Sequence, residues 1–170
     1  GSYYSQLHGQ YHPWFREFLR ARGDYDIFLF DTNGNLVYSV YKELDYATNL
    51  NTGEWKSTDL GNSYRDALNG NEAFYDFQPY APSADAPASF ISRPIVSDAG
   101  TTLGVLVFQM PIDRLNAVMQ VTAGMGETGE TYIVGEDKLM RSDSRFSEDS
   151  TILSSTVDTA PVTAAFEGQS

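Results

Sequence analysis

The stretch DIFLFDTNGNLVYSV at residues 26–40 decides the fold, because it reads as two β-strands joined by a tight turn. Residues 27–30 form an uninterrupted apolar run, which is typical of a strand that is buried on both faces. Residues 31–35 (DTNGN) supply side chains that tolerate positive φ in turns. Aromatic and β-branched residues resume at 36–41, so the stretch predicts a β-hairpin.

Three further strands are expected downstream, at 73–80, 88–97 and 101–110. The turn at 98–100 joins the last two strands, and residues 104–108 are again uniformly apolar. Because the runs 27–30 and 104–108 lack polar alternation, we expect their strands to be central neighbours. The pattern predicts an α+β fold that resembles the PAS arrangement, with a five-stranded antiparallel sheet of order 2-1-5-4-3 flanked by helices.

A long polar connection at 42–60, followed by a short helix at 60–68, separates the hairpin from the later strands. Connections of this length in a compact domain are often functional. We therefore expect this segment to cover a ligand pocket on the sheet.

Two longer helices are expected to flank the sheet. The first begins near Pro13, which suits a first helical turn, and ends at Gly23. The second opens at Pro111. Each has one apolar face at helical spacing, formed by Trp14, Phe15, Phe18 and Leu19 in the first and by Ile112, Leu115, Val118 and Met119 in the second.

The composition changes after residue 123, where several glycines indicate a segment rich in turns. A strand at 131–134, the start of another at 139–140 and a short helix at 162–166 are expected there. The predicted organisation is a helical lead-in, a PAS-like domain and the start of a second unit, at 1–23, 24–122 and 123–170.

Composition excludes several classes of function. The net charge of -12 and pI of about 4.3 disfavour binding to nucleic acid or anionic lipid. The absence of cysteine excludes disulfides, thiol nucleophiles and thiolate metal sites. No apolar stretch approaches the roughly 20 residues that a membrane helix needs. Gly1 and Ser2 are typical of a cloning remnant, so we expect an excised piece of a longer protein.

No motif for catalysis, cofactor binding or a metal site is present, so we predict a protein that is not an enzyme and has no cofactor. His8 and His12 have the spacing of a metal pair on a helix, but Gly9 and Pro13 are expected to interrupt that helix. Residues 31–35 lack the glycine and glutamate positions of a calcium loop.

Three stretches carry a family resemblance: DIFLFDTNGNLVYSVYKELDYATNL, DFQPYAPSADAPASFISRPI and GETGETYIVGEDKLMRSDSRF. They resemble the periplasmic sensor regions of methyl-accepting chemotaxis proteins and of related receptor histidine kinases and nucleotide cyclases. These regions are Cache domains, the extracellular relatives of PAS. The resemblance spans about residues 11–153, with the last part similar to the beginning of a membrane-proximal Cache unit.

The resemblance implies the extracytoplasmic sensing domain of a bacterial transmembrane chemoreceptor, located in the periplasm or outside the cell on a membrane-anchored parent. It implies a small polar metabolite as ligand, with carboxylates and amines as candidate classes, no nucleic-acid partner and a homodimer in the full receptor. Ligand binding is expected to close the 42–60 segment and shift the exit helix. The spaced Tyr, Arg, Trp, Tyr and two Asp of the amino-acid-binding signature are not found here.

Candidate ligand-binding residues lie on the expected pocket face and its covering segment, where polar groups would orient a ligand and aromatic rings would contact it. They are Tyr38, Lys42, Asp45, Tyr46, Asn49, Trp55, Phe77, Tyr80, Ser83, Phe90, Ser92, Arg93 and Gln109.

Simpler interpretations compete with these roles. Lys42 and Glu43 also suit a solvated strand end, and Trp55 also suits a loop anchor. Strand alternation separates Asp76 from Phe77 unless the strand is bulged. A buried Arg93 would indicate an anionic ligand, whereas an exposed one would not.

Two alternatives to ligand sensing stay open. A dimerisation or signal-relay module of a histidine kinase or nucleotide cyclase would have a pocket filled by its own side chains. A carboxylate-based hydrolase would need two facing acids in a cleft.

Overall fold

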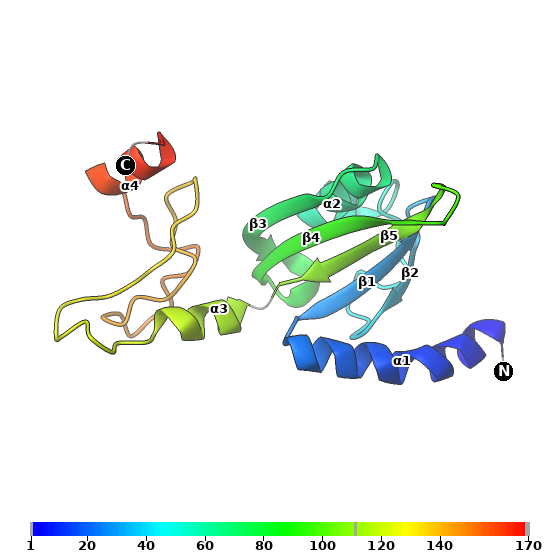
Figure 1. Ribbon diagram of the computed structural model, residues 1–170, viewed down its shortest axis with the longest axis horizontal. Coiled ribbons are helices and arrows are strands. Elements are labelled where there is room, and N and C mark those ends of the chain that lie inside the picture. Colours follow the sequence, from blue (N-terminus) through cyan, green and yellow to red (C-terminus); the bar gives the residue numbers. More distant parts are fainter. Residues whose placement is uncertain (1, 111, 169–170) are drawn as a thin grey trace.

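The computed structural model describes residues 2–110 and 112–168, so Pro111, where the exit helix was expected to open, lies outside the described residues. A five-stranded antiparallel sheet of order β2-β1-β5-β4-β3 forms its centre, which confirms the predicted topology (Figure 1). The strands are β1 (Asp26–Asp31), β2 (Leu36–Ser39), β3 (Ala73–Tyr80), β4 (Ala86–Val96) and β5 (Thr102–Gln109).

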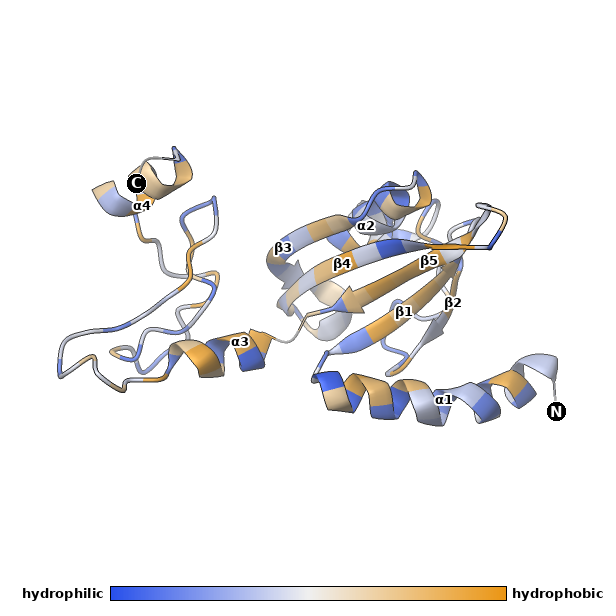
Figure 2. Ribbon diagram, in the orientation of Figure 1, coloured by the Kyte–Doolittle hydropathy of each residue, from blue (hydrophilic) through white to orange (hydrophobic). Residues whose placement is uncertain are grey.

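Both faces of the sheet are covered near its centre. On one face, α2 (Asp59–Leu68) and the segment before it, with the 3-10 helix η1 (Glu54–Ser57), enclose a core around Phe28, Phe90 and Tyr64. On the other face, α1 (Tyr3–Arg22) packs against Ile27. Figure 2 shows apolar colour along β1 and β5, as expected for strands that contribute side chains to both cores.

The start of α1 corrects the sequence-based prediction. The helix begins at Tyr3 rather than near Pro13, with the Ser2 hydroxyl accepting from the Ser5 N–H as its N-terminal cap. Pro13 lies inside the helix, where it removes one backbone hydrogen bond. Packing of the next turns on the sheet compensates, because Phe15 and Phe18 contact the core on that face.

The expected interruption between His8 and His12 was also wrong. Their rings stack on the continuous helix with centroids 4.5 Å apart. Within residues 2–110 and 112–168, no group of three or more His, Cys, Asp or Glu side chains is arranged to hold a metal ion.

Helix α2 starts and stops where local signals predict. Thr58 caps its N-terminus by accepting from the Gly61 N–H, and Asn69 and Gly70 follow its last turn. Gly70 has φ of 93°, a conformation that glycine adopts without steric cost. The helix is therefore fixed directly after the long connection.

The C-terminal part lies beside the sheet domain and is joined to it through α3 (Ile112–Met119) (Figure 1). The strand expected at 131–134 does not form, and isolated bridges link Val134 to Met140 and Leu139 to Thr156. Such short pairs lack the neighbouring strands that a stable sheet needs. The expected short helix is present as α4 (Ala160–Phe166).

Among the described residues, no helix combines the length and the apolar content that crossing a bilayer requires.

Candidate functional site

Polar side chains gather at one end of the sheet, where β1 begins and β5 ends. There the segment between β2 and α2, residues 40–58, meets the short 3-10 helix η2 (Ala81–Ser83). We call residues 40–58 the covering segment. We call this group of polar side chains the buried polar cluster; its members are Asp26, Glu43, Asp45, Tyr80, Ser83 and Gln109. Five of the six side chains are buried, including the acids Asp26 and Asp45, and the third acid, Glu43, is half-buried. Buried acids are rare unless they are paired or functional, so this end of the sheet is the candidate site.

Asp45 is the cluster's acid on the covering segment, with 0% of its surface exposed. Its Oδ2 accepts a 2.6 Å hydrogen bond from the hydroxyl of Tyr80, whereas its Oδ1 has no hydrogen-bond partner. Burial raises the pKa of the Asp45 carboxyl above its usual range. Burial, together with the adjacent Asp45, also raises the pKa of Tyr80, so this hydroxyl stays a donor.

Glu43 anchors a second chain of hydrogen bonds. Its Oε2 accepts from the Ser83 hydroxyl at 2.6 Å, and its Oε1 accepts from the Tyr25 hydroxyl at 3.0 Å. The Gln109 amide nitrogen donates weakly to Ser83 Oγ at 3.4 Å, which leaves Gln109 Oε1 without a partner. A second buried acceptor therefore lies unpaired near Asp45.

Asp26 closes the cluster on the β1 side, directly opposite Gln109 in the sheet register. Its Oδ1 accepts from the backbone N–H groups of Ile27 at 2.6 Å and Val40 at 2.8 Å. Burial raises the pKa of Asp26 to about 7. The carboxyl thus fixes the end of β2 to β1, and it titrates near neutral pH.

Two cavities flank the cluster. One of about 290 Å³ lies between residues 57–59 and strands β3 and β4, with Tyr80 and Phe90 in its wall. The other, of about 670 Å³, includes Tyr25 and Glu43 in its lining. Since Tyr80 and Glu43 each belong to both the cluster and a cavity wall, each cavity adjoins the cluster.

Five of the sequence-predicted residues lie at or beside this site: Asp45, Tyr80, Ser83, Phe90 and Gln109. The ring of Phe90 packs edge-on against Tyr80, with centroids 5.1 Å apart. The sequence analysis did not propose Asp26 as a site residue and assigned Glu43 only to a solvated strand end. An acid directly before the apolar run 27–30 was the available signal for Asp26.

Three other candidates lie toward α1. The Lys42 ammonium is 2.8 Å from His8 Nε2, the Tyr38 hydroxyl is 2.9 Å from His12 Nδ1, and the Tyr46 hydroxyl is 2.6 Å from that of Tyr4. A register shift in the β1–β2 pairing and a positive φ of 56° at Lys42 accompany this placement. Alternation alone could not anticipate these irregularities.

The remaining candidates have other environments. Asn49 hydrogen-bonds to the β1–β2 turn, Trp55 packs against the α2-side core, and the buried Ser92 hydroxyl donates to the Ser63 carbonyl of α2. Arg93 is 73% exposed and pairs with Glu72, as the simpler interpretation expected. Asn49, Trp55 and Ser92 thus support the fold around the site, whereas the Arg93 pair lies at the surface.

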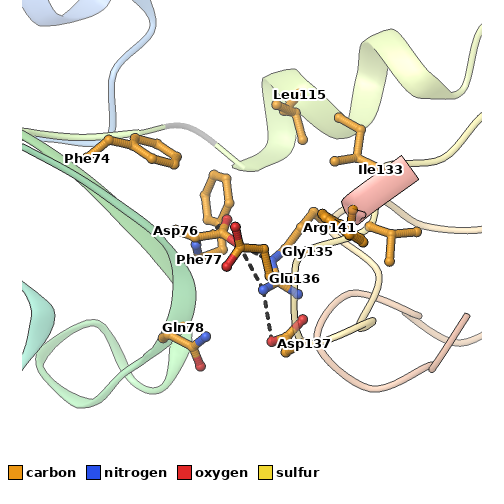
Figure 3. Close-up of a pocket in the computed structure, with 12 residues that line it drawn as sticks. Phe74, Asp76, Phe77, Gln78, Leu115, Ile133, Gly135, Glu136, Asp137 and Arg141 are labelled. Atoms are coloured by element: carbon orange, nitrogen blue, oxygen red, sulfur yellow. Dashed lines mark hydrogen bonds and ion pairs between the residues drawn. The ribbon is translucent and has the colours of Figure 1, made fainter. Parts of the chain in front are cut away.

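Phe77 lies in a different cavity, of about 880 Å³, between β3 and the C-terminal part (Figure 3). The β3–β4 register shifts between Tyr75 and Gln78, so Asp76 and Phe77 both line this space. The buried Arg141 guanidinium lies 2.9 Å from both Asp76 and Asp137. Because both of its ion-pair partners are protein carboxylates, this cavity is a weaker candidate for a ligand site than the buried polar cluster.

Comparison with known proteins adds information at the level of fold. No family model matches the chain, and no curated protein matches it in sequence. Solved structures do match. The Vibrio cholerae histidine kinase DctB sensor domain is 16% identical with a TM-score of 0.61, covering 96% of this chain and 57% of that chain.

Two chemoreceptor ligand-binding domains are also similar. Campylobacter jejuni Tlp3 in complex with L-valine is 16% identical with a TM-score of 0.62, covering 98% of this chain and 62% of that chain. Pseudomonas fluorescens CtaA in complex with L-serine is 15% identical with a TM-score of 0.52, covering 79% of this chain and 53% of that chain.

The chain spans little more than half the length of these matched structures. Its sheet order, its covering helix and its flanking helix are those expected of a Cache domain. The chain has the Cache fold, the PAS-like architecture that these chemoreceptor and histidine-kinase sensor domains share.

Proposed function

We propose that this chain is the extracytoplasmic small-molecule-sensing domain of a bacterial transmembrane chemoreceptor and that it has no enzymatic activity of its own. One observation carries the proposal: two buried acceptors, Asp45 Oδ1 and Gln109 Oε1, lie without partners in a cluster whose members Tyr80 and Glu43 each line a cavity. A buried acceptor without a donor costs about 1–3 kcal/mol. A bound ligand that donates to these atoms would recover that cost.

The fold supports the same function. The matched Tlp3 and CtaA domains are ligand-binding domains of chemoreceptors, and the matched DctB domain is a sensor domain. In such receptors the sensing domain lies outside the membrane on an anchored parent chain. We assign this chain the same location.

Signalling would pass through the end of β5. Gln109 is the last residue of that strand, and α3 begins at Ile112, three positions later in the chain. A ligand that hydrogen-bonds to Gln109 and shifts it would therefore displace the start of the exit helix. The size of the shift is limited by the difference in ligand affinity between the two positions of the helix.

The outer surface of α1 favours a homodimer. Tyr3, Tyr11 and Trp14 are 76%, 51% and 59% exposed on this helix. Aromatic side chains are enriched at interfaces between proteins. The same observation favours a second candidate function, a dimerisation module that relays a signal without binding a ligand itself.

A thermal-shift screen of small amines, carboxylates, sugars and purines separates the two candidates. A sensor is expected to be stabilised by at least one compound, by about 2.7 kcal/mol when ligand is present at about 100 times its dissociation constant. If no compound stabilises the chain and α1 variants such as Trp14→Ala abolish dimers, the relay function is favoured.

A further inference from the structure

We propose that the buried polar cluster binds a primary ammonium group, so that the ligand is an organic amine without a carboxylate beside its amino group. This inference rests on the proposed sensing function and specifies the ligand class of the same site.

The unpaired atoms themselves select for a donor. Asp45 Oδ1 and Gln109 Oε1 both accept hydrogen bonds, and their residues are 0% and 1% exposed. A carboxylate ligand has only acceptors and could not satisfy either atom. An ammonium group carries three donors and no acceptor, so it complements an acceptor of this kind.

The charge of the cluster's side chains also favours a ligand with a positively charged group. Asp26, Glu43 and Asp45 all contribute carboxyl groups, and the groups that perturb Asp26 and Asp45 electrostatically are other acids. A buried carboxylate from a ligand would add a further negative charge with no cation to pair with it. A cation would instead be stabilised by the acids already present.

Two basic side chains, one adjacent to Glu43 in the sequence and one in a cavity wall that includes Glu43, have hydrogen-bond partners outside the cluster. Lys42 is directed to His8 and to the rings of Tyr38 and Tyr46. Arg114, which lines the larger flanking cavity, donates to the Arg22 carbonyl. Their hydrogen bonds go to His8, Ser39 and Arg22, none of which is a member of the cluster.

Aromatic side chains near the cluster suit an ammonium ligand that carries an alkyl or aryl chain. Phe90 lines the cavity of about 290 Å³ together with Tyr80, the residue whose hydroxyl donates to Asp45 Oδ2. Ring faces attract ammonium ions, and apolar rings receive an alkyl or aryl chain. This volume lies at the small end of the range for ligand pockets, which indicates a small amine.

Matched pairs of compounds test the inference on the full chain by isothermal titration calorimetry. The amines are butylamine, 1,4-diaminobutane and 2-phenylethylamine. Their partners, which differ only by an added carboxylate, are norvaline, ornithine and phenylalanine, and pentanoate serves as the carboxylate without an amine. At least one amine is expected to bind at least about tenfold more tightly than its amino acid, with no binding of pentanoate.

Variants tie the binding to the cluster. Asp45→Asn keeps the shape and removes the charge, so amine affinity is expected to fall about tenfold or more. Asp98→Asn, in the exposed turn at the opposite end of the sheet, is the matched control and is expected to bind like the parent. Circular dichroism and melting temperature show whether each variant is folded.

The possible results separate the amine assignment from the sensing function. Equal or tighter binding of the amino acids, binding of pentanoate, failure of every amine, or unchanged amine affinity in a folded Asp45→Asn variant would overturn the amine assignment. If a broader screen then finds another ligand, the sensing function stands and only its ligand class is wrong. If that screen finds none, the sensing function itself fails.

Discussion

The hydroxyl of Tyr80 at the end of β3 donates a 2.6 Å hydrogen bond to Oδ2 of Asp45 on the covering segment. The two residues are 35 positions apart in the chain. This bond joins the segment to the sheet at the point where Asp45 Oδ1 remains unpaired. It is therefore both a structural tie and one side of the proposed ligand site.

Removing this hydroxyl is expected to destabilise the fold. Tyr80→Phe leaves the buried Asp45 carboxyl without its donor, which is expected to lower the free energy of unfolding by about 1–3 kcal/mol. Urea denaturation measures this value. The control is Tyr75→Phe, because the Tyr75 hydroxyl donates to Asp66 at 2.7 Å where water can replace it. Equal effects of the two variants would contradict the assigned role of Tyr80.

The pH dependence of stability is expected to reveal Asp26. Because its pKa is raised from 3.8 to about 7, the folded chain keeps a proton that the unfolded chain releases within this window. The free energy of unfolding therefore falls as pH rises through the window. Asp26→Asn removes this contribution, so its stability relative to the parent is expected to increase from about pH 4 to about pH 7.

Urea denaturation at several pH values across that window tests the expectation. Asp98→Asn, an exposed acid, is the control and is expected to follow the parent. A constant difference between parent and Asp26→Asn at all pH values would show that Asp26 does not titrate there.

Amine affinity is expected to rise with pH. Burial raises the pKa of Asp45, and the groups facing it are Tyr80 and the acids Glu43 and Asp26. A bound cation favours the charged carboxylate, so binding releases protons and tightens as pH rises through the pKa of Asp45. Titration calorimetry in buffers of different ionisation enthalpy counts the released protons. In Asp45→Asn this release is expected to diminish, and an unchanged count would contradict the assignment.

The ion pairs of Arg141 are expected to hold the C-terminal part against β3. The Arg141 side chain is 3% exposed and contacts Asp76 and Asp137, so Arg141→Met leaves both acids without their partner. Faster hydrogen exchange in residues 124–168 is the expected result, with exchange in β1 and β5 unchanged. Arg93→Met is the control, because exposed pairs such as that with Glu72 contribute about 0–1 kcal/mol.

Two glycines are expected to respond oppositely to alanine. Gly9 lies within α1 with nothing near an added Cβ, so Gly9→Ala is expected to stabilise by about 0.5–1 kcal/mol through helix propensity. At Gly104 on β5 an added Cβ would collide with the Phe30 carbonyl. Gly104→Ala is expected to cost about 1–3 kcal/mol. Thermal denaturation compares them, and a stabilising Gly104→Ala would contradict the close strand contact.

Local pattern was sufficient for most of the sheet. The apolar runs 27–30 and 104–108 identified the central strands, and the turn at 31–35 identified the hairpin. The strand at 73–80 has the bounds that the sequence predicted. These features depend on continuous apolar runs and on turn chemistry between near neighbours, which a sequence displays directly.

Predictions failed where long-range packing outweighed local signals. Pro13 suggested the start of a helix, yet Phe15 and Phe18 pack on the sheet and the helix continues through the proline. The strand expected at 131–134 lacks neighbouring strands to pair with and forms only isolated bridges. Propensity is a weak guide in both cases, because tertiary contacts decide which local preference is realised.

The sequence by itself determined the order of strands, the absence of thiol chemistry from this chain, and the presence of Asp45, Tyr80 and Gln109 among the candidates. Only the tertiary structure decided that these three meet beside Glu43 while Lys42 is directed to the opposite face. The physical reason is that burial and the pairing of distant acceptors are properties of the folded chain, set by which segments pack together.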